Sequence, residues 1–336
     1  MPRRGAEPKP PWTAVPAAMK AEVARILGSP VARAERVYGG YAPSATYRLL
    51  LADGRRAFFK GVYPTDSGAK WDLDREEEIY RGALEYMRPW APDFYGSTRA
   101  DGWHGILLED LGPQNSLPWT AAKARRAARS YAEFHKNTYG RKLPRWLSRV
   151  EHRDFSAFWD RLAGSGELDR TAALAGARAE EAAEWLDVAL PVLRETARAL
   201  AHARPPFALM HFDTRSDNVW LHADLLRMAD WNWASVGPPE FELAAFAQSI
   251  AAEGGPAPER VEAWYADVLP LDDDALDASI AGIAGYFADR AWREPIPGLP
   301  RIRLVQRKQL RASLAWAARR LDLPDPKWLG AVPVRA

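Results

Sequence analysis

The sequence predicts an α+β fold in two lobes, a small N-terminal lobe built on an antiparallel sheet with one key helix and a larger, mainly helical C-terminal lobe. Residues 36–62 contain two strand-like segments joined by Asp53-Gly54, a dipeptide typical of tight β-hairpin turns. Residues 105–111 form a short apolar segment that fits a buried strand. Beyond residue 113 the chain becomes rich in alanine and arginine, with apolar residues at helical spacing.

The expected domain boundaries follow from this change in pattern. Residues 1–16 are basic and rich in proline and contain no apolar segment of signal-peptide length, so we predict a disordered tail. Residues 17–113 form the predicted N-terminal lobe, which ends in a linker between the lobes. Residues 114–336 form the predicted C-terminal lobe, and the total length suits a protein of two lobes.

Composition places the chain among folded globular proteins and excludes several classes of function. Its 336 residues are 47% hydrophobic and carry a net charge of +2, which is too small to predict a nucleic-acid partner. The absence of cysteine excludes disulfides and a cysteine nucleophile and suits a cytoplasmic protein. No segment approaches the roughly eighteen apolar residues of a membrane span, so we expect no membrane association.

Lys60 lies among apolar residues in the second predicted strand. Side chains alternate along a strand, so Lys60 shares a face with Phe58 and Val62. A lysine in such a place must either reach water or pair with an anion, because an unpaired buried charge is costly. An edge strand that turns Lys60 to solvent is the alternative explanation.

The next predicted helix offers an anionic partner. We expect Asp74 to cap this helix, with Glu77 completing a capping pattern. At about 100° per residue, Glu76 then lies near the centre of the apolar face, whereas Glu78 points almost opposite. The sequence therefore predicts an ion pair between Lys60 and Glu76.

The segment of residues 210–233 carries the strongest chemical signal. His211, Asp213 and Asn218 are spaced as H-x-D-x-x-x-x-N, and Asp230 follows after two short apolar runs that suggest a tight hairpin. Such a hairpin would return Asp230 to the side of Asn218. Phosphoryl transfer requires a carboxylate that orients the attacking hydroxyl, together with oxygen ligands for Mg²⁺ on the phosphates. The other possibility is that these residues are ordinary polar side chains of a loop with no chemical role.

The segments HFDTRSDN and ADWNWASVGPPEFEL resemble the phosphotransferase family that includes aminoglycoside phosphotransferases and choline-kinase-like enzymes, which share the catalytic architecture of protein kinases. The resemblance implies that Asp213 is the catalytic carboxylate, that Asn218 and Asp230 bind Mg²⁺, and that His211 braces the loop. It implies an ATP- and Mg²⁺-dependent kinase that phosphorylates a hydroxyl of a small molecule. The sequence departs from the family at Glu242, where an aspartate is usual, so the geometry of that helix start is in question.

The resemblance also implies a nucleotide site. In such enzymes the strand lysine, here Lys60, holds the α- and β-phosphates, and the helix glutamate, here Glu76, holds the lysine. Backbone groups around Glu109 and Leu111 would bind adenine at the hinge between the lobes; a core strand with an exposed acidic end would contain the same residues.

A glycine-containing turn adds a weaker expectation. Gly40 and Ser44 lie in the turn of residues 39–46, where backbone amides and the serine hydroxyl could cover phosphates. A simple hairpin turn explains the same residues.

Two alternative functions share these motifs. A protein kinase is disfavoured because the interval from Asp230 to Pro238 is too short for a long activation segment. A pseudokinase or ligand-binding module would keep the fold without turnover, and ATP consumption with a hydroxylated acceptor would distinguish it from a kinase.

Arg215 stands two residues after the catalytic aspartate. By resemblance to the loop of protein serine/threonine kinases, which commonly place a lysine at this offset, Arg215 would contact the transferring phosphate. A guanidinium can bind two phosphate oxygens at once. A structural ion pair with Asp217 or a neighbouring acid is the alternative.

The acceptor is less well determined. Candidates include aminoglycosides, other hydroxylated antibiotics, sugars and amino alcohols. We expect a polyhydroxylated and cationic acceptor because carboxylates are available beyond the catalytic loop, although they would equally serve as solvated or capping groups. These carboxylates are Glu240, Glu242, Glu262 and Asp267. The sequence leaves the oligomeric state open.

Overall fold

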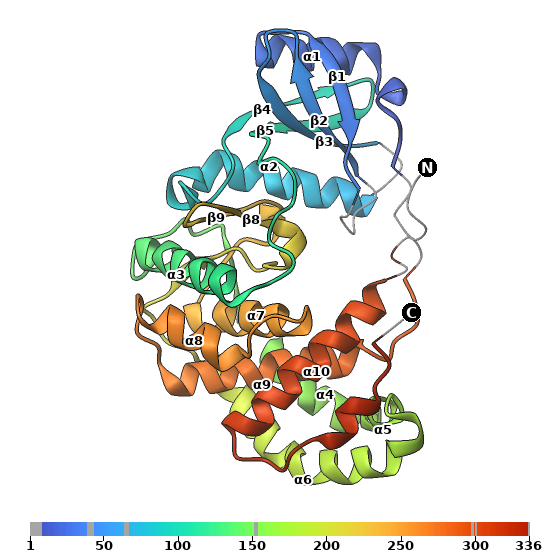
Figure 1. Ribbon diagram of the computed structural model, residues 1–336, viewed down its shortest axis with the longest axis vertical. Helices are drawn as coiled ribbons and strands as arrows, with labels where there is room; N and C mark the ends of the chain where they lie inside the picture. The colour runs from blue at the N-terminus through green and yellow to red at the C-terminus, as the bar shows by residue number, and fades with distance from the viewer. Residues whose placement is uncertain are drawn as a thin grey trace.

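An antiparallel sheet organises the N-terminal lobe. In the part of the chain that the structure describes, five strands lie in the order β1-β2-β3-β5-β4 (Figure 1). These strands are β1 (Val31–Arg36), β2 (Ala45–Leu51), β3 (Arg56–Val62), β4 (Phe94–Ala100) and β5 (Trp103–Leu108). The predicted hairpin at Asp53-Gly54 joins β2 to β3, and Gly54 adopts φ 86° there. The two predicted segments correspond to β2 and β3, whereas β1, which ends at Arg36, was not predicted.

The computed structural model describes residues 9–38, 44–63, 67–150, 154–296, 299 and 301–334. Within these residues the fold class agrees with the prediction, since the sheet lobe and a mainly helical lobe are stacked along the long axis (Figure 1). No helix in the described ranges combines the length and the apolar character needed to cross a bilayer.

The segment before α1 (Ala17–Leu27) packs against the sheet. Trp12, in a short 3-10 helix, has its ring centroid 5.0 Å from that of Tyr47 and 5.7 Å from that of Phe59. The prediction of a disordered tail is therefore wrong for residues 9–16, because burial of the large indole ring offsets the entropy lost on ordering the segment. Residues 1–8 of that predicted tail lie outside the described residues.

Helix α2 (Ser67–Met87) lies between the sheet and the C-terminal lobe (Figure 1). The prediction that Asp74 caps this helix is wrong, because the helix begins one to two turns earlier, at Ser67. The additional turns are held in place by apolar packing, since Leu73 is fully buried and Trp71 contacts Trp233 with ring centroids 5.4 Å apart.

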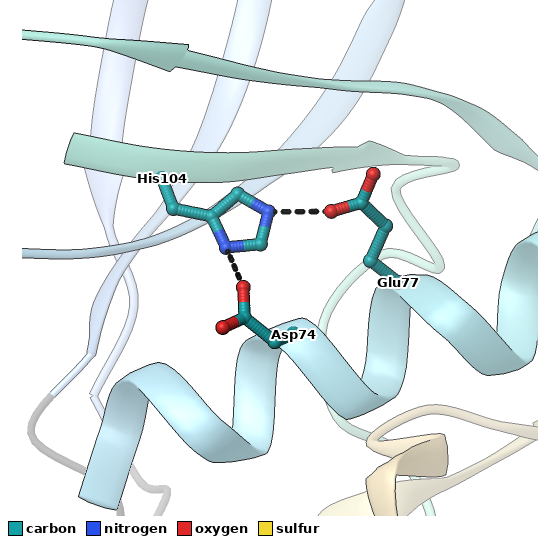
Figure 2. Close-up of side chains that lie close together, drawn as sticks. All are labelled: Asp74, Glu77 and His104. Atoms are coloured by element: carbon teal, nitrogen blue, oxygen red, sulfur yellow. Dashed lines mark ion pairs between the residues drawn. The ribbon is translucent and has the colours of Figure 1, made fainter. Parts of the chain in front are cut away.

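Asp74 and Glu77 connect α2 to the sheet instead. Figure 2 shows His104 of β5 between the two carboxylates, with Nδ1 3.0 Å from Asp74 Oδ1 and Nε2 2.8 Å from Glu77 Oε2. A histidine and two carboxylates at this spacing resemble a metal site. However, Arg99 donates to the same two oxygens, at 3.0 Å and 2.9 Å. These side chains are therefore a structural ion-pair network that fixes the rotation of α2 about its axis.

The C-terminal lobe contains most of the helices and a continuous apolar core that extends up to α2. Its helices are α3 (Ala121–Thr138), α4 (Phe158–Ser165), α5 (Leu168–Ala173), α6 (Ala179–Arg198), α7 (Pro239–Ala252), α8 (Pro258–Ala266), α9 (Asp273–Arg290) and α10 (Ile302–Arg320). Its short strands are β6 (Ser148–Arg149), β7 (Ala208–Met210), β8 (Val219–His222), β9 (Leu225–Met228) and β10 (Ser235–Gly237). Helix α6 runs through Pro191, which is exposed, so that water can satisfy the carbonyl that loses its partner.

The ion-pair network around Glu77 predicts an acid-sensitive contribution to stability. Burial raises the pKa of Glu77, but hydrogen bonds from Ser97 and Arg81 and the charges of Arg99 and His104 outweigh it and lower this pKa from 4.5 to about 2. Because the folded value lies below the unfolded one, the contribution is present above about pH 4.5 and is lost as the pH falls towards 2. Glu77→Gln should lower the melting temperature at pH 7 and should weaken the dependence of stability on pH in this window.

Thermal unfolding followed by circular dichroism between pH 7 and pH 2.5 tests this prediction. Glu78→Gln is the matched control, because Glu78 lies on the exposed side of the same helix. If the melting temperatures of the wild type and Glu77→Gln changed in parallel with pH, the network would not contribute as described.

Candidate functional site

The predicted ion pair between Lys60 and Glu76 is present. Lys60 Nζ lies 2.7 Å from Glu76 Oε2, and both side chains are buried. Glu78 is exposed, as its helical phase predicted. Lys60 Nζ also lies 2.5 Å from Asp230 Oδ1, so one ammonium group joins the sheet, α2 and the C-terminal lobe.

Electrostatics keep this lysine charged. Burial lowers the pKa of Lys60, but Asp230 and Glu76 more than reverse this effect and raise the pKa above its ordinary value. Burial likewise raises the pKa of Asp230, and the charge of Lys60 outweighs it and brings the pKa below its usual range. The site therefore holds a permanent cation and an ionised carboxylate side by side.

His211 braces the catalytic loop from beneath, as the resemblance implied. This buried imidazole accepts a hydrogen bond at Nδ1 from the Asp213 amide at 3.2 Å. Its Nε2–H donates to the Ala229 carbonyl at 2.7 Å, and this pair of contacts defines the tautomer. Because Ala229 directly precedes Asp230, the imidazole links the positions of the two carboxylates.

The carboxylate of Asp213 is held by two neighbours. Asp213 Oδ2 accepts from Asn218 Nδ2 at 3.0 Å and from an Arg215 terminal nitrogen at 3.2 Å. Arg215 Nε lies 3.0 Å from Asp213 Oδ1, and its terminal nitrogen lies 3.5 Å from Asp217 Oδ2. The ion pair with Asp217 that we considered is therefore present, alongside closer contacts to Asp213.

The hairpin of β8 and β9 brings Asp230 to Asn218, as predicted. The Ala229 amide donates to the Asn218 carbonyl at 2.9 Å. Asp230 adopts the left-handed conformation with φ 66°, which costs a residue with a Cβ about 1–2 kcal/mol. The contact with Lys60 helps to hold the carboxylate in this conformation.

Glu242 has a role that the sequence analysis missed. Its carboxylate accepts from the amides of His211, at 2.8 Å, and Phe212, and from His135 Nε2 at 2.9 Å. Glu242, the position at which the sequence departs from the family pattern, is therefore bound to the backbone of the loop that carries Asp213. His135 is buried, and its Nδ1 bonds the Tyr265 hydroxyl. The buried position of Glu242 on α7 depends on tertiary packing and has no local sequence signal.

A cavity of about 200 Å³ lies between the sheet and the β8–β9 hairpin. It brings together all of the described residues for which we predicted a nucleotide or metal contact. These are Ser44, Lys60, Glu76, Glu109, Leu111, Asn218 and Asp230. Gly40, the remaining predicted residue, lies outside the described residues. Lys9 also lines this cavity, and its Nζ donates to Thr46 Oγ1 at 2.9 Å; the sequence analysis had placed it in a disordered tail.

The segment between the lobes is anchored on both sides. The Glu109 amide donates to the Asp93 carbonyl at 2.9 Å, and the Glu109 carboxylate pairs with Arg227 at 2.5 Å. The Leu111 carbonyl accepts from His222 Nε2 at 3.1 Å. The side chain of Glu109 therefore locks the segment to β9.

A second cavity of about 450 Å³ lies on the other side of the catalytic loop. Its lining is mainly aromatic and aliphatic, with a few amide groups. The lining residues are Phe155, Phe212, Asp213, Thr214, Arg215, Trp233, Phe241, Ala245, Gln248, Ile283, Tyr286, Phe287, Ile302, Val305, Gln306 and Gln309. Asp213 and Arg215 thus face this second cavity, whereas Asn218 and Asp230 face the first.

The carboxylates that we expected to be available for a cationic acceptor do not line this second cavity. Glu240 is buried and accepts from the Asp272 amide at 3.1 Å. Glu262 pairs with Arg320 at 2.7 Å, and Asp267 pairs with Arg129 at 3.1 Å. Glu242 holds the catalytic loop, as described above. Each of these carboxylates already has a partner within the protein.

The described chain has the two-lobed, protein-kinase-like fold of small-molecule kinases, as the motifs predicted. Spectinomycin phosphotransferase APH(9)-Ia, solved with ADP and spectinomycin, matches with a TM-score of 0.57 at 14% sequence identity, over 89% of this chain and 98% of that one. An aminoglycoside phosphotransferase from Alicyclobacillus acidocaldarius matches with a TM-score of 0.54 at 16% identity, over 98% of both chains.

A thermostable mutant of the aminoglycoside phosphotransferase APH(4)-Ia, solved with AMP-PNP and hygromycin B, has a TM-score of 0.51 at 14% identity. This match covers 94% of the present chain and 99% of the other. No family model matches the sequence, and a comparison with curated proteins likewise finds no match. The likeness is thus one of fold, carried by chains of very different sequence.

Proposed function

We propose that this protein is a kinase that transfers the γ-phosphate of ATP to a hydroxyl group of a small molecule with the help of Mg²⁺. The observation that carries the proposal is the convergence of four polar residues at the boundary between the two cavities. Lys60, Asn218 and Asp230 line the first cavity, and Asp213 lines the second and is bonded to Asn218. A phosphate donor and a hydroxyl acceptor bound in these cavities would meet at Asp213.

The first cavity suits a nucleotide. The charged Lys60 would bind the α- and β-phosphates, which is the role of the strand lysine in kinases. The carbonyl of Glu109 and the amide of Leu111 are the backbone groups that would meet the base. Fold neighbours crystallised with ADP or AMP-PNP support nucleotide binding to this fold.

Asn218 and Asp230 have the donor chemistry that a magnesium ion requires. Asn218 uses Nδ2 for Asp213, which leaves its Oδ1 as a metal ligand. Asp230 is ionised and contacts Lys60 through one oxygen, which leaves the other oxygen for a cation. Carboxylate and amide oxygens are the ligands that Mg²⁺ prefers. When bound, the ion would neutralise charge on the phosphates.

Asp213 would orient the acceptor hydroxyl and accept its proton. As the acceptor oxygen forms its bond to Pγ, the bond from Pγ to the β-bridging oxygen breaks, ADP leaves, and the hydroxyl proton passes to Asp213. The bonds from Asn218 and Arg215 orient the carboxylate for this task. Arg215 lies close enough to stabilise charge on the moving phosphoryl group. The alternative of a binding module without turnover has no observation in its favour.

Asp213→Asn should lower acceptor-dependent turnover by a factor on the order of 10² or more, the usual scale for lost proton-transfer catalysis, while ATP affinity changes little. Acceptor-dependent ADP release and titration calorimetry with ATP and Mg²⁺ would measure the two quantities, using the first acceptor found by a ³¹P NMR screen. Asp224→Asn, in the exposed turn between β8 and β9, is the matched control. Near-normal turnover in Asp213→Asn would refute the assignment.

Arg215→Ala should lower kcat by a factor on the order of 10², the scale for one lost charge-stabilising donor. ATP affinity and the melting temperature should stay close to those of the wild type. Arg215→Lys should recover only part of the rate, because an ammonium cannot form the two-pronged contact. A purely structural role through Asp217 makes a different prediction, a fall in melting temperature with kcat and KM changing together. Unchanged kcat in Arg215→Ala would exclude a catalytic contribution.

A further inference from the structure

The second cavity has the size of a small-molecule site and lies beside the reacting groups. Its volume of about 450 Å³ falls within the range of roughly 300–1,000 Å³ for ligand pockets. Asp213 and Arg215 form part of its wall. If the proposed function holds, on which this inference rests, the acceptor must occupy this cavity in order to present its hydroxyl to Asp213.

Aromatic rings packed against one another form one wall of the cavity. Phe155 is the central ring, with its centroid 4.8 Å from that of Phe241, 5.7 Å from Phe212 and 5.3 Å from Tyr286. Phe212 and Phe241 are themselves nearly parallel, with an interplanar angle of 15°. Because these rings support one another, their positions are set before a ligand arrives. Such a wall binds apolar ring faces and excludes water.

The charges at the cavity already compensate each other. Among the described lining residues, the only ionised side chains are Asp213 and Arg215, and these two are in contact with each other. An ammonium group that left water for this cavity would find no carboxylate without a cationic partner. Burial of such a charge is costly, so each amino group on a ligand would weaken binding.

The first turns of α10 place further positive charge near the cavity. Ile302, Val305 and Gln306 of this helix line the cavity; Arg303 lies between the first two in the sequence, and Arg307 directly follows Gln306. Arg303 donates to the Glu294 carbonyl at 2.8 Å and to Gln306 Oε1 at 2.8 Å.

Arg307 donates to the Ala291 carbonyl at 3.1 Å. Neither this arginine nor Arg303 pairs with a carboxylate among the described residues, whereas Arg293 of the same region pairs with Asp289. Each arginine therefore adds a positive charge without a carboxylate ion-pair partner to the helix that lines the cavity, which disfavours a polycation there.

The remaining polar side chains at the cavity are neutral and include amides, which recognise neutral oxygen atoms. The side-chain amide of Gln309 makes no hydrogen bond to any described residue. Gln248 donates to the Ala245 carbonyl at 2.9 Å, but its buried Oε1 accepts no hydrogen bond in the described part of the chain. An amide can donate to and accept from hydroxyl, ether and carbonyl groups. These two glutamines give a neutral, oxygen-rich ligand the polar partners that fix its orientation.

We propose that the acceptor is an uncharged alcohol built on an aromatic or aliphatic ring system, and that aminoglycosides with several amino groups are not substrates. The transfer step remains the one described above, in which the ring compound supplies the hydroxyl oxygen that bonds to Pγ and the proton that passes to Asp213. Specificity would come from the aromatic wall and the amides, and the fold neighbours' cationic acceptors would be excluded.

The first experiment measures binding without nucleotide, so it does not depend on catalysis. Saturation-transfer NMR would compare phenyl β-glucoside, a neutral ring-bearing alcohol, with spectinomycin. We expect the wild type to give a signal with phenyl β-glucoside. Val305→Asp, which places a charge in the cavity, should weaken this signal at least tenfold. Leu304→Asp is the matched control, since the adjacent Leu304 does not line the cavity. Binding of spectinomycin, or binding of the glucoside that ignores Val305→Asp, would overturn the proposal.

The second experiment measures transfer with ATP and Mg²⁺. A ³¹P NMR screen of neutral ring-bearing alcohols, with spectinomycin and hygromycin B alongside, should show phosphorylation of a neutral compound and of neither antibiotic. Phosphorylation of the antibiotics in preference to every neutral compound would overturn the acceptor class while supporting the kinase function. Failure of ATP to bind, with the glucoside still bound in a Val305-dependent way, would overturn the kinase function and support the chemistry of the cavity.

Discussion

One buried ammonium group holds the functional centre together. Lys60 lies between Glu76 on α2 and Asp230 after the β8–β9 hairpin, and a charge in this position is tolerated only when it is paired and hydrogen-bonded. The sheet, α2 and the C-terminal lobe must therefore meet at this point. The ion-pair network between α2 and the sheet helps to hold Glu76 beside Lys60. The hydrogen bond from His211 to the Ala229 carbonyl helps to hold the adjacent Asp230 there.

This arrangement separates shared chemistry from specificity. The residues proposed to handle phosphate and metal sit on the sheet, on α2 and on the β8–β9 hairpin, where backbone and ion-pair contacts fix them. The proposed acceptor cavity is built mainly on helices of the C-terminal lobe, apart from the loop residues next to Asp213, and Lys60 does not line it. An apolar and neutral acceptor cavity is therefore compatible with a fold whose solved neighbours bind aminoglycosides.

Local patterns predicted the features that depend on local geometry. Alternation along β3 and the helical phase of α2 were enough to pair Lys60 with Glu76, and two apolar runs were enough to return Asp230 to Asn218. The remaining features depend on contacts between distant segments. The packing of Trp12 on the sheet, the hold of Glu242 on the catalytic loop and the aromatic cavity arise from residues far apart in the chain. A glutamine or a phenylalanine on a helix is common in folded proteins, so no local signal marked the second cavity.

The central claim is that the charge of Lys60 is held in place by Glu76 to receive the phosphates of a nucleotide. Titration calorimetry of ATP with Mg²⁺ against the wild type, Glu76→Gln and the exposed control Glu78→Gln tests it most directly, with melting temperatures recorded to verify folding. Loss of one partner of a buried pair costs about 3–5 kcal/mol in general, and Asp230 remains to compensate in part. We predict at least a roughly tenfold loss of ATP affinity in Glu76→Gln, equivalent to about 1.4 kcal/mol, and none in Glu78→Gln. Equal affinities in the two folded variants would contradict the account.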